Sequence, residues 1–261
     1  MKSYRVKESI PKDAEKELAE YPELTRHLLF HREIKKRDTA KVFLNPDYYV
    51  HVHDPFLLLG MEKAVERILR AIEKKEKICI YSDYDMDGIP GAIVLSDFFK
   101  KIGYFENIRV YIPHRHDEGF GLNHDALLDI AKEGAKLLIT IDCGIADPKE
   151  VAHANRLGLD VIVTDHHLPG PKLPEAFAIL NPKCSPKYPF QDLCGSGVVF
   201  KLIQAILKKN NFGLKEGVEK WLLDMVGMAT CSDMVPLVGE NRVFAHYGLK
   251  VLRKSPRVGL M

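Results

Sequence analysis

From residue 77 onward, short apolar runs alternate with longer amphipathic stretches along the chain. The runs consist mainly of Ile, Val and Leu without polar alternation, which is typical of strands that are covered on both faces. They occupy residues 78–81, 108–112, 137–141 and 161–163. Strands that alternate with helices in this way predict an α/β fold with a doubly wound, mainly parallel sheet flanked by helices.

The clearest of the predicted crossover helices follows the run at 137–141. Asp147 is expected to cap this helix, with Pro148 at its first position and Glu150 completing a capping box. Gly158 can end the helix in the left-handed conformation. The pattern therefore supports a strand–helix–strand connection in this part of the chain.

Residues 1–76 carry helical rather than strand-like patterns. Ala64, Val65 and Ile68 recur at helical spacing, and charged residues that include Arg67 are expected on the opposite, exposed face. Two shorter helices are expected at 14–20 and 22–30, and an irregular connection at 43–55. We expect a helical N-terminal extension, residues 1–76, packed on a larger domain formed by residues 77–261.

Composition places the chain among ordinary globular proteins. Of its 261 residues, 46% are hydrophobic and 28% are charged, and the formal net charge is +2, which neither requires nor excludes nucleic acid as a ligand. No apolar run approaches the length of a membrane span, and the N-terminus lacks the apolar centre of an export signal. The five cysteines contain no C-x-x-C pair, which favours reduced thiols and a cytoplasmic protein.

Acidic residues and histidines follow three of the predicted strands at the point where each strand ends. In a parallel sheet these ends border the ligand crevice, so the side chains are expected to converge. Crowded carboxylates raise one another's pKa, and divalent cations resolve that conflict. Oxygen-rich sites with one or two imidazoles suit Mn²⁺ or Mg²⁺, and a pair of such ions could support phosphoryl transfer. The residues are Asp83, Asp85, Asp87, Asp142, Asp165, His166 and His167.

Each of these residues also has an ordinary interpretation. An Asp at a strand end commonly forms a turn or caps a helix, and a histidine pair is commonly solvated or hydrogen-bonded. Turn formation alone does not account for the same chemistry at three strand ends. The set as a whole therefore favours a metal site.

The sequence resembles the DHH phosphoesterases, and among them the RecJ-type single-strand-specific exonucleases. The resemblance covers nearly the entire chain and consists of an ordered set of motifs. The motifs are Ser-Asp-Tyr-Asp-Met-Asp-Gly at 82–88, Ile-Asp-Cys-Gly at 141–144, Thr-Asp-His-His at 164–167 and a segment starting Ser-Asp-Met-Val-Pro at 232–242, with further similar segments at 112–122 and 194–201.

The resemblance implies metal ligands beyond those that the strand pattern indicates. Asp87, Asp142, His166 and Asp233 are implied to hold one ion, with Asp142 bridging to a second. Asp83 and Asp85 would hold that second ion, and Asp85 is also expected to take part in catalysis. Where two-metal pyrophosphatases of the family have a histidine, this chain has Tyr81, so the second ion would depend more on Asp83.

The resemblance implies two further catalytic residues. His167 would lie beside the scissile phosphate as a hydrogen-bond donor or acid. Asp165 would orient a neighbouring imidazole from behind.

Substrate contacts are expected from two glycine-containing segments. Arg115 could hold a phosphate through its guanidinium, although it could also be a surface charge. Gly195, Ser196 and Gly197 precede a predicted helix, where backbone amides suit a phosphate but where small residues also permit close packing. Phe120 could stack on a base, but we expect it to be tucked into the core.

The function implied by the resemblance is metal-dependent hydrolysis of phosphodiester bonds in single-stranded DNA. The enzyme would act as a 5′-to-3′ exonuclease that releases 5′-mononucleotides in DNA repair or recombination, with single-strand-binding protein or a helicase as a protein partner. RecJ-type chains continue into a C-terminal substrate-binding domain that is not evident here. Two alternatives stay open: a DHH enzyme for short oligonucleotides or cyclic dinucleotides, and an inactive DHH scaffold.

Overall fold

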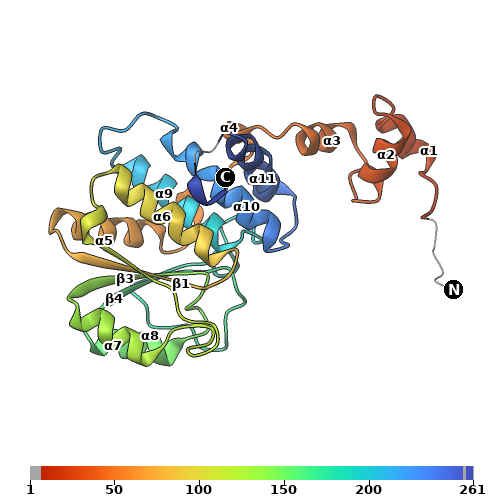
Figure 1. Ribbon diagram of the computed structural model, residues 1–261. Helices are drawn as coiled ribbons and strands as arrows, with labels where there is room; N and C mark the ends of the chain where they lie inside the picture. Colours follow the sequence, from red (N-terminus) through yellow and green to blue (C-terminus); the bar gives the residue numbers. More distant parts are fainter. Residues whose placement is uncertain (1–6, 255–256, 261) are drawn as a thin grey trace. The chain divides into compact units, whose positions relative to one another are not determined.

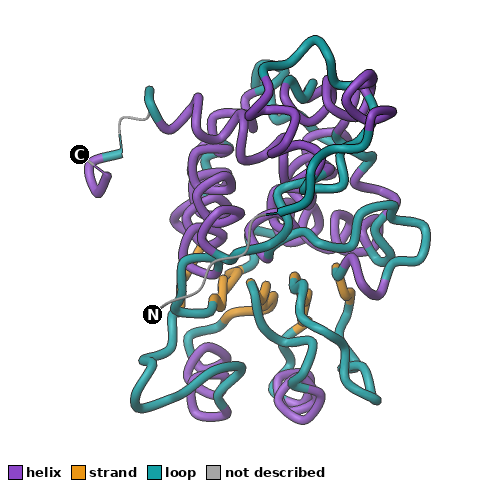
Figure 2. The backbone as a smooth tube through the Cα atoms, turned by 90° about the vertical axis from the view of Figure 1, so that its right-hand side faces the viewer, coloured by secondary structure: helices purple, strands orange, loops and turns teal. Residues whose placement is uncertain are grey.

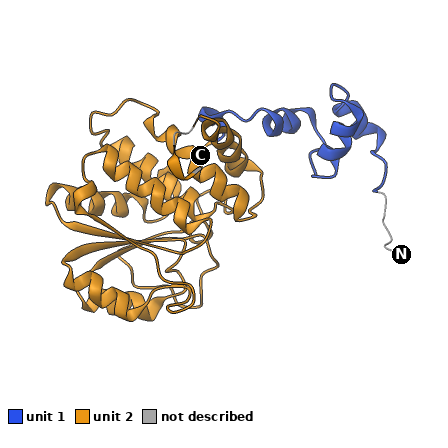
Figure 3. Ribbon diagram, in the orientation of Figure 1, with its two compact units in different colours: residues 1–51 blue, residues 52–261 orange. Residues whose placement is uncertain are grey.

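The structure is a computed structural model that describes residues 7–254 and 257–260. It contains two compact units, residues 1–51 and residues 52–261 (Figure 3). The compact units thus divide 25 residues before the boundary expected from the sequence, and helix α5 (Met61–Glu73) belongs to the second unit.

The first unit is helical. Leu18, Leu29, Ile34 and Ala40 form its small hydrophobic core. One helical turn lies inside the stretch expected to be irregular, because Asp47 caps it through the amides of Tyr49 and Val50. The helices are α1 (Lys12–Glu17), α2 (Glu23–Phe30), α3 (Arg37–Leu44) and α4 (Tyr48–His51).

The second unit alternates strands and helices, as the sequence predicts. After α5 its strands are β1 (Lys77–Ser82), β2 (Ile108–Tyr111), β3 (Ala135–Ile141), β4 (Asp160–Thr164) and β5 (Ala178–Leu180). Its remaining α-helices are α6 (Gly88–Lys101), α7 (His124–Lys132), α8 (Pro148–Arg156), α9 (Gly195–Lys209), α10 (Leu223–Ser232) and α11 (Gly239–Leu252). The four expected strands are all present, and β5 was not expected.

The five strands form one parallel sheet in the order β2-β1-β3-β4-β5. The chain winds outward from β1 in one direction to β2 and in the other to β3. The order therefore reverses between β1 and β3, and such a switch point opens a crevice at the carboxyl ends of the two strands. The predicted doubly wound α/β fold is confirmed.

Helices cover both faces of the sheet (Figure 1, Figure 2). Helices α7 and α8 lie on one face, where Cys79 and Tyr81 of β1 join their apolar residues in one cluster. Helices α5, α6 and α9 lie on the other face, and α10 and α11 pack beyond them (Figure 1). Because both faces are covered, β1, β3 and β4 are buried along almost their whole length. None of the described helices is both long enough and apolar enough to cross a membrane.

Arg67 of α5 does not lie on an exposed face, in contrast to the expectation from helical spacing. Its side chain is only 3% exposed and forms salt bridges with Asp160 at 2.5 Å and Glu76 at 2.8 Å. Periodicity marks which face is buried, but a paired arginine can enter that face. The ion pairs fix α5 at the amino-terminal end of the sheet.

Asp147 precedes α8 as expected, but its side chain makes no capping hydrogen bond to the helix. It instead accepts a hydrogen bond of 3.0 Å from the backbone N–H of Leu122. Helix α8 still begins at Pro148, and Gly158 follows its end with a φ of +81°. Asp147 thus ties a neighbouring loop to the sheet.

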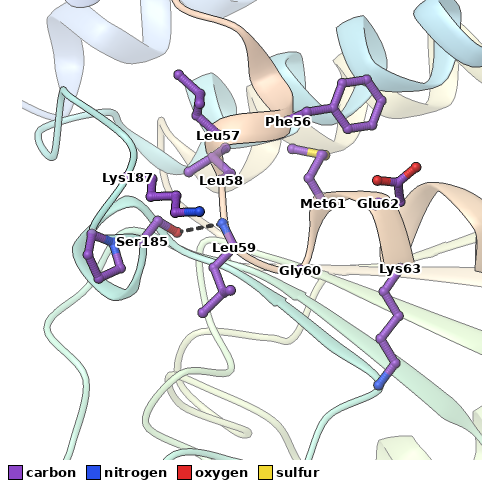
Figure 4. A pocket seen from close by; sticks show the side chains of 11 residues that line it. Phe56, Leu57, Leu58, Leu59, Gly60, Met61, Glu62, Lys63, Ser185 and Lys187 are labelled. Atoms are coloured by element: carbon purple, nitrogen blue, oxygen red, sulfur yellow. Dashed lines mark hydrogen bonds between the residues drawn. The ribbon is translucent and has the colours of Figure 1, made fainter.

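An apolar cavity of about 520 Å³ lies where the chain enters α5 (Figure 4). The N–H of Leu59 donates a 3.0 Å hydrogen bond to Ser185 Oγ across it. At Gly60 the φ is +81°, and a Cβ atom would stand 2.9 Å from the carbonyl oxygen of Ile179 in β5. Glycine at this position lets the α5 entry lie against the edge strand.

Candidate metal centre

The acidic and histidine motifs meet at the carboxyl ends of β1, β3 and β4. Asp83 follows β1, Asp142 follows β3 and Asp165 follows β4. A fourth contribution comes from Asp233, which ends α10 on the helical layer above the sheet. The crevice at the switch point thus collects side chains from four distant segments.

His166 lies at the centre of the first group of possible ligands. Its Nε2 atom is 3.1 Å from Asp142 Oδ1, 3.7 Å from Asp87 Oδ2 and 3.7 Å from Asp233 Oδ2. Three carboxylates therefore surround one imidazole nitrogen, and one oxygen from each is within reach of a common point. The structure brings these four residues together as the sequence motifs imply.

A second group shares Asp142 with the first. Asp83, Asp85 and Asp142 each offer a carboxylate oxygen, and these oxygens lie within 4.8 Å of one another. Asp85 Oδ1 also accepts hydrogen bonds from the N–H groups of Asp87 and Gly88, at 2.7 and 2.9 Å. Asp142 is thus placed between two groups of oxygen ligands, and Asp85 supports the entry to α6 at the same time.

Several atoms of these groups are buried without a hydrogen-bond partner among the described residues. A buried polar atom that lacks a partner costs about 1–3 kcal/mol, so native proteins rarely keep several together. Divalent cations bind to such oxygen and imidazole lone pairs. The residues present therefore fit a cation site. The atoms are Asp83 Oδ1, Asp142 Oδ1, His166 Nε2 and Asp233 Oδ2.

Burial and mutual repulsion act on the acidic residues in the same direction. Burial, followed by the charges of Asp87 and Asp85, raises the pKa of Asp142 to about 11. Burial and the same neighbours raise the pKa of Asp233 to about 6. The cluster therefore holds protons at neutral pH unless a positive charge replaces them.

Asp87 is oriented by the N-terminus of α9. Its carboxylate accepts hydrogen bonds from the N–H of Gly195 at 2.5 Å and from the N–H of Ser196 at 2.8 Å. The Ser196 hydroxyl donates to the backbone oxygen of Asp87 at 2.6 Å. The two amides that sequence reasoning assigned to a substrate phosphate are thus buried against a candidate metal ligand.

Gly195 and Gly197 differ in the space around them. A Cβ atom on Gly195 would lie 2.8 Å from the Cβ of Asp142, which no ordinary contact allows. A Cβ atom on Gly197 would meet its nearest neighbour, in Leu193, at 3.6 Å, an ordinary packing distance. Only the first glycine is required by the close approach of α9 to the candidate centre.

The backbone of Asp142 adopts a left-handed conformation, with a φ of +60°. Asp and Asn tolerate this region better than other residues with a side chain. The turn sends the chain sharply away from the end of β3, so that the carboxylate stays in the crevice. This backbone conformation is a local cost that the surrounding structure must offset.

Asp165 holds His167 in place. Its Oδ1 atom accepts hydrogen bonds from His167 Nδ1 at 2.8 Å and from the N–H of the same residue at 3.0 Å, while Oδ2 accepts from the N–H of Ile145. The hydrogen bond that His167 donates to Asp165 raises the pKa of His167. The His167 side chain is 45% exposed, so its ring remains accessible at the mouth of the crevice.

Tyr81 packs in the apolar cluster on the face of the sheet that α7 and α8 cover. Its ring stacks on Tyr111 with a centroid distance of 5.2 Å, and its hydroxyl donates a 3.0 Å hydrogen bond to the carbonyl oxygen of Gly121. The Tyr81 hydroxyl is therefore engaged by a backbone oxygen. It anchors the loop that follows β2.

This loop, residues 113–122, is tied down at several points. Glu118 accepts hydrogen bonds from the Tyr111 hydroxyl at 2.5 Å and from the N–H of His114 at 2.7 Å. With the Tyr81–Gly121 and Asp147–Leu122 hydrogen bonds, these contacts fix both halves of the loop. A side chain on the loop is thereby held over the crevice with little freedom to move.

Two loop side chains lie beside the motif residues. The Arg115 guanidinium stands 4.6 Å from the ring centroid of Tyr84, in the first motif. The Phe120 ring meets His167 edge-on at 5.7 Å and is 54% exposed. The expectation that Phe120 is tucked into the core is wrong, because the fixed loop turns its ring toward the mouth of the crevice.

Lys183 is a candidate residue that sequence reasoning missed. It follows β5 in a short 3-10 helix, and its ammonium donates a hydrogen bond to the backbone oxygen of His166. Burial lowers the pKa of His166, the charge of Asp87 opposes this shift, and the charges of His167 and Lys183 lower the pKa further. The sequence signal that could have identified Lys183 is its position after a strand. That strand, β5, has only three residues, so its pattern is too short to recognise.

The fold and the site define a doubly wound α/β protein with a carboxylate and imidazole centre at its switch point. The chain belongs to the DHH family, because the family model described as "DHH family, N-terminal domain" matches residues 77–230. The match contains the first three motifs and ends just before Asp233.

The chain is similar to curated proteins named single-stranded-DNA-specific exonuclease RecJ. It is 42% identical over 243 residues to the protein from Bacillus subtilis (strain 168), which covers 91% of this chain and 29% of that relative. With the protein from Escherichia coli (strain K12) it is 35% identical over 206 residues, covering 75% of this chain and 35% of the relative. The chain thus spans about a third of the length of these relatives.

Solved structures with the same fold were determined with manganese. A structure of exonuclease RecJ bound to manganese matches with a TM-score of 0.70 and 31% identity, over 78% of this chain and 50% of the other. The structure of RecJ from Thermus thermophilus in complex with Mn²⁺ matches with a TM-score of 0.76 and 26% identity, over 95% of this chain and 34% of the other.

Proposed function

We propose that this chain hydrolyses phosphodiester bonds in single-stranded DNA in a metal-dependent reaction. The observation that carries the proposal is the convergence of four buried, unpartnered ligand atoms on one crevice, from Asp83, Asp142, His166 and Asp233. The similarity to relatives named single-stranded-DNA-specific exonuclease supports the substrate. We further propose a 5′-to-3′ direction of attack that releases 5′-mononucleotides in DNA repair or recombination. Catalysis is assigned to the domain formed by residues 77–261.

Two divalent cations, Mn²⁺ or Mg²⁺, would be held by the two groups that share Asp142. The first site would use Asp142 with Asp87, His166 and Asp233, and the second would use Asp142 with Asp83 and Asp85. When bound, such ions lower the pKa of a water molecule and neutralise charge that develops on the phosphate.

The neighbouring side chains supply the proton and the orientation of the substrate. His167, held by Asp165, is accessible and carries a raised pKa, so it can donate a hydrogen bond or a proton to the leaving oxygen. Arg115 can hold a phosphate while Phe120 offers a ring face to a base. Gly195 and Ser196 act indirectly, by fixing Asp87, and Gly197 follows them in the first turn of α9.

A nuclease assay tests the proposal. Labelled single strands and the matching duplexes are incubated with Mn²⁺, or with a chelator, and the products are separated by length. We expect mononucleotides from the single strand alone, and no products with the chelator. Equal cleavage of the duplex, or cleavage that survives the chelator, would contradict the proposal.

The sharpest inactive control is Asp142→Asn. Asparagine accepts the left-handed backbone of this position and keeps the shape of the side chain, so the fold should be retained. It removes the charge that both cation groups share. We expect cleavage to fall by at least about a thousandfold, since the contribution of each positioned ion is several kcal/mol.

We further propose that the chain acts in the cytoplasm, with single-strand-binding protein or a helicase as partner. The support is the DNA substrate named for its relatives. Co-purification with either partner, before and after digestion of nucleic acid, tests the association. If neither partner co-purifies with the chain, the proposed association is contradicted.

A further inference from the structure

A groove distinct from the cation site lies at the other end of helix α6. It has a cavity volume of about 590 Å³ and is formed by the end of α6, the start of α10 with the 3-10 turn before it, and the end of α11. The metal motifs do not contribute to it. Nothing in the proposed reaction uses its residues.

Trp221 forms one wall of this groove and is 55% exposed. It is the only tryptophan among the 261 residues of the chain. A large aromatic ring at the surface of a groove is costly to hydrate, and such rings serve as stacking platforms for bases in proteins that bind single strands.

The groove has an excess of positive charge. Lys100 and Lys101 at the end of α6 and Lys254 after α11 line it, and none of the three has an acidic partner within residues 7–254 and 257–260. The two acidic groups of the lining, Asp97 and Asp224, are both bound by Arg257 at 2.7 Å. The three lysines are therefore available to an anionic ligand.

Helix α6 connects the groove to the candidate centre. It begins at Gly88, directly after Asp87, and ends at Lys101. Its 14 residues span roughly 20 Å at about 1.5 Å per residue. The groove and the candidate centre therefore lie at opposite ends of one helix, roughly 20 Å apart along its axis.

We propose that this groove is a second binding site for single-stranded nucleic acid, in which bases stack on Trp221 and the lysines contact phosphates. The choice of a polynucleotide rests on the proposed function, whereas the site itself follows from the ring and the unpaired cations. The groove would retain a strand whose reacting end lies in the crevice.

The lone tryptophan allows a direct test by intrinsic fluorescence. The Asp142→Asn protein is titrated, without metal, with oligothymidylate of about 16 nucleotides, which is within the range of single-strand sites. Tryptophan emission is excited selectively. We expect saturable quenching with the oligonucleotide, little quenching with a dinucleotide, and little with inorganic polyphosphate, which carries charge but no bases.

A charge-reversal pair provides the matched control. Lys100→Glu with Lys101→Glu should weaken oligonucleotide binding at least about tenfold and reduce the slope of log affinity against log salt by about 1.4, from about 0.7 per lost phosphate contact. Lys74→Glu with Lys136→Glu makes the same change in net charge at exposed positions outside the groove. The control pair should bind within about twofold of the parent.

The outcomes separate this site from the proposed function. Suppose that the parent protein cleaves single strands, that Trp221 is not quenched, and that the two lysine pairs have equal effects. This result would overturn the second site and leave the proposed nuclease activity intact. Quenching that depends on Lys100 and Lys101 supports the site even if no cleavage is found. Equal quenching by polyphosphate would overturn a base-stacking role.

Discussion

The hydroxyl of Tyr81 donates a 3.0 Å hydrogen bond to the carbonyl oxygen of Gly121, and it thereby joins the strand that precedes the first aspartate motif to the loop that carries Arg115 and Phe120. Both partners are buried. The substrate loop and the candidate centre are therefore mechanically connected through β1.

Tyr81→Phe should loosen this loop without removing the ring that stacks on Tyr111. The buried Gly121 oxygen loses its donor, which costs about 1–3 kcal/mol. We expect the KM for oligonucleotides to rise severalfold, with little change in kcat on a small phosphodiester that does not reach the loop. Steady-state kinetics on the two substrates distinguish these effects.

The control for this variant is Tyr104→Phe. Its hydroxyl also donates to the backbone, where the carbonyl oxygens of Ala71 at 2.8 Å and Glu76 at 2.6 Å are both in reach, but at the far end of α5. It should lower stability by a similar amount without altering the KM. A rise in KM in both variants would show that the loop is not specifically held by Tyr81.

Gly195→Ala and Gly197→Ala should differ in their effect on Mn²⁺ affinity, although the two positions are only two residues apart on α9. The first places a methyl group 2.8 Å from the Asp142 side chain and should reduce Mn²⁺ affinity at least about tenfold. The second has ordinary contacts and should leave affinity unchanged while stabilising the helix by up to about 1 kcal/mol. Calorimetric titration with Mn²⁺ measures both, and equal affinities would contradict the close approach.

Without metal, the stability of the protein should fall as the pH rises above about 4. In the folded state the pKa of Asp142 is about 11 and that of Asp233 is about 6, against an ordinary value of 3.8. The folded protein therefore binds more protons than the unfolded chain above the ordinary pKa, and stability is lost as these groups ionise. Urea unfolding at about pH 5 and about pH 8 measures the slope.

Mn²⁺ should weaken or reverse the decrease in stability with rising pH, because the ion binds the ionised carboxylates. At a hundred times its Kd the ion adds about 2.7 kcal/mol to the stability of the folded state. Asp142→Asn should unfold with a flatter pH profile and gain much less from Mn²⁺. An unchanged profile in this variant would show that Asp142 is not the dominant buried acid.

Lys201→Met should be strongly destabilising although Lys201 is not one of the candidate metal ligands. The Lys201 ammonium contacts Glu240 at 2.9 Å, and both side chains have 0% exposure. Removal of the cation leaves a buried carboxylate unpaired, at a cost of about 3–5 kcal/mol. Urea unfolding measures the loss.

The double variant Lys201→Met with Glu240→Gln separates charge from packing. The oxygen of the glutamine amide can still accept from the N–H of His53, while its NH2 group can donate to the Tyr188 hydroxyl oxygen, so much of the stability should return. No recovery in the double variant would mean that the loss reflects packing of the lysine stem.

The strands and their end-of-strand motifs could be predicted because buried parallel strands have a simple pattern. The apolar runs at β1 and β3 are uninterrupted, and the chemistry follows them directly. Asp233 could not be found in this way, since it ends a helix; only the resemblance pointed to it. The hydrogen bonds from the first backbone N–H groups of α9 to the Asp87 carboxylate could not be predicted either, because backbone amides do not appear in the pattern of side chains.

Side chains that depart from the average behaviour of their type account for the errors. Helical spacing places Arg67 on the exposed face, but Asp160 and Glu76 pair with it inside. Phe120 is expected in the core because aromatic rings are commonly buried, but two glycines with positive φ turn its loop outward. Tertiary partners decide such cases, and one sequence does not contain them in readable form.

Strand β1 serves both layers of the molecule, because consecutive residues of a strand point to opposite faces. Tyr81 points to the loop anchor, while the residues after Ser82 supply the cation ligands. Deleting a single residue inside this strand would exchange its two faces: the phenol would turn toward α6, and the carboxylates would lose their alignment with Asp142. The length of β1 is therefore as constrained as the identity of its residues.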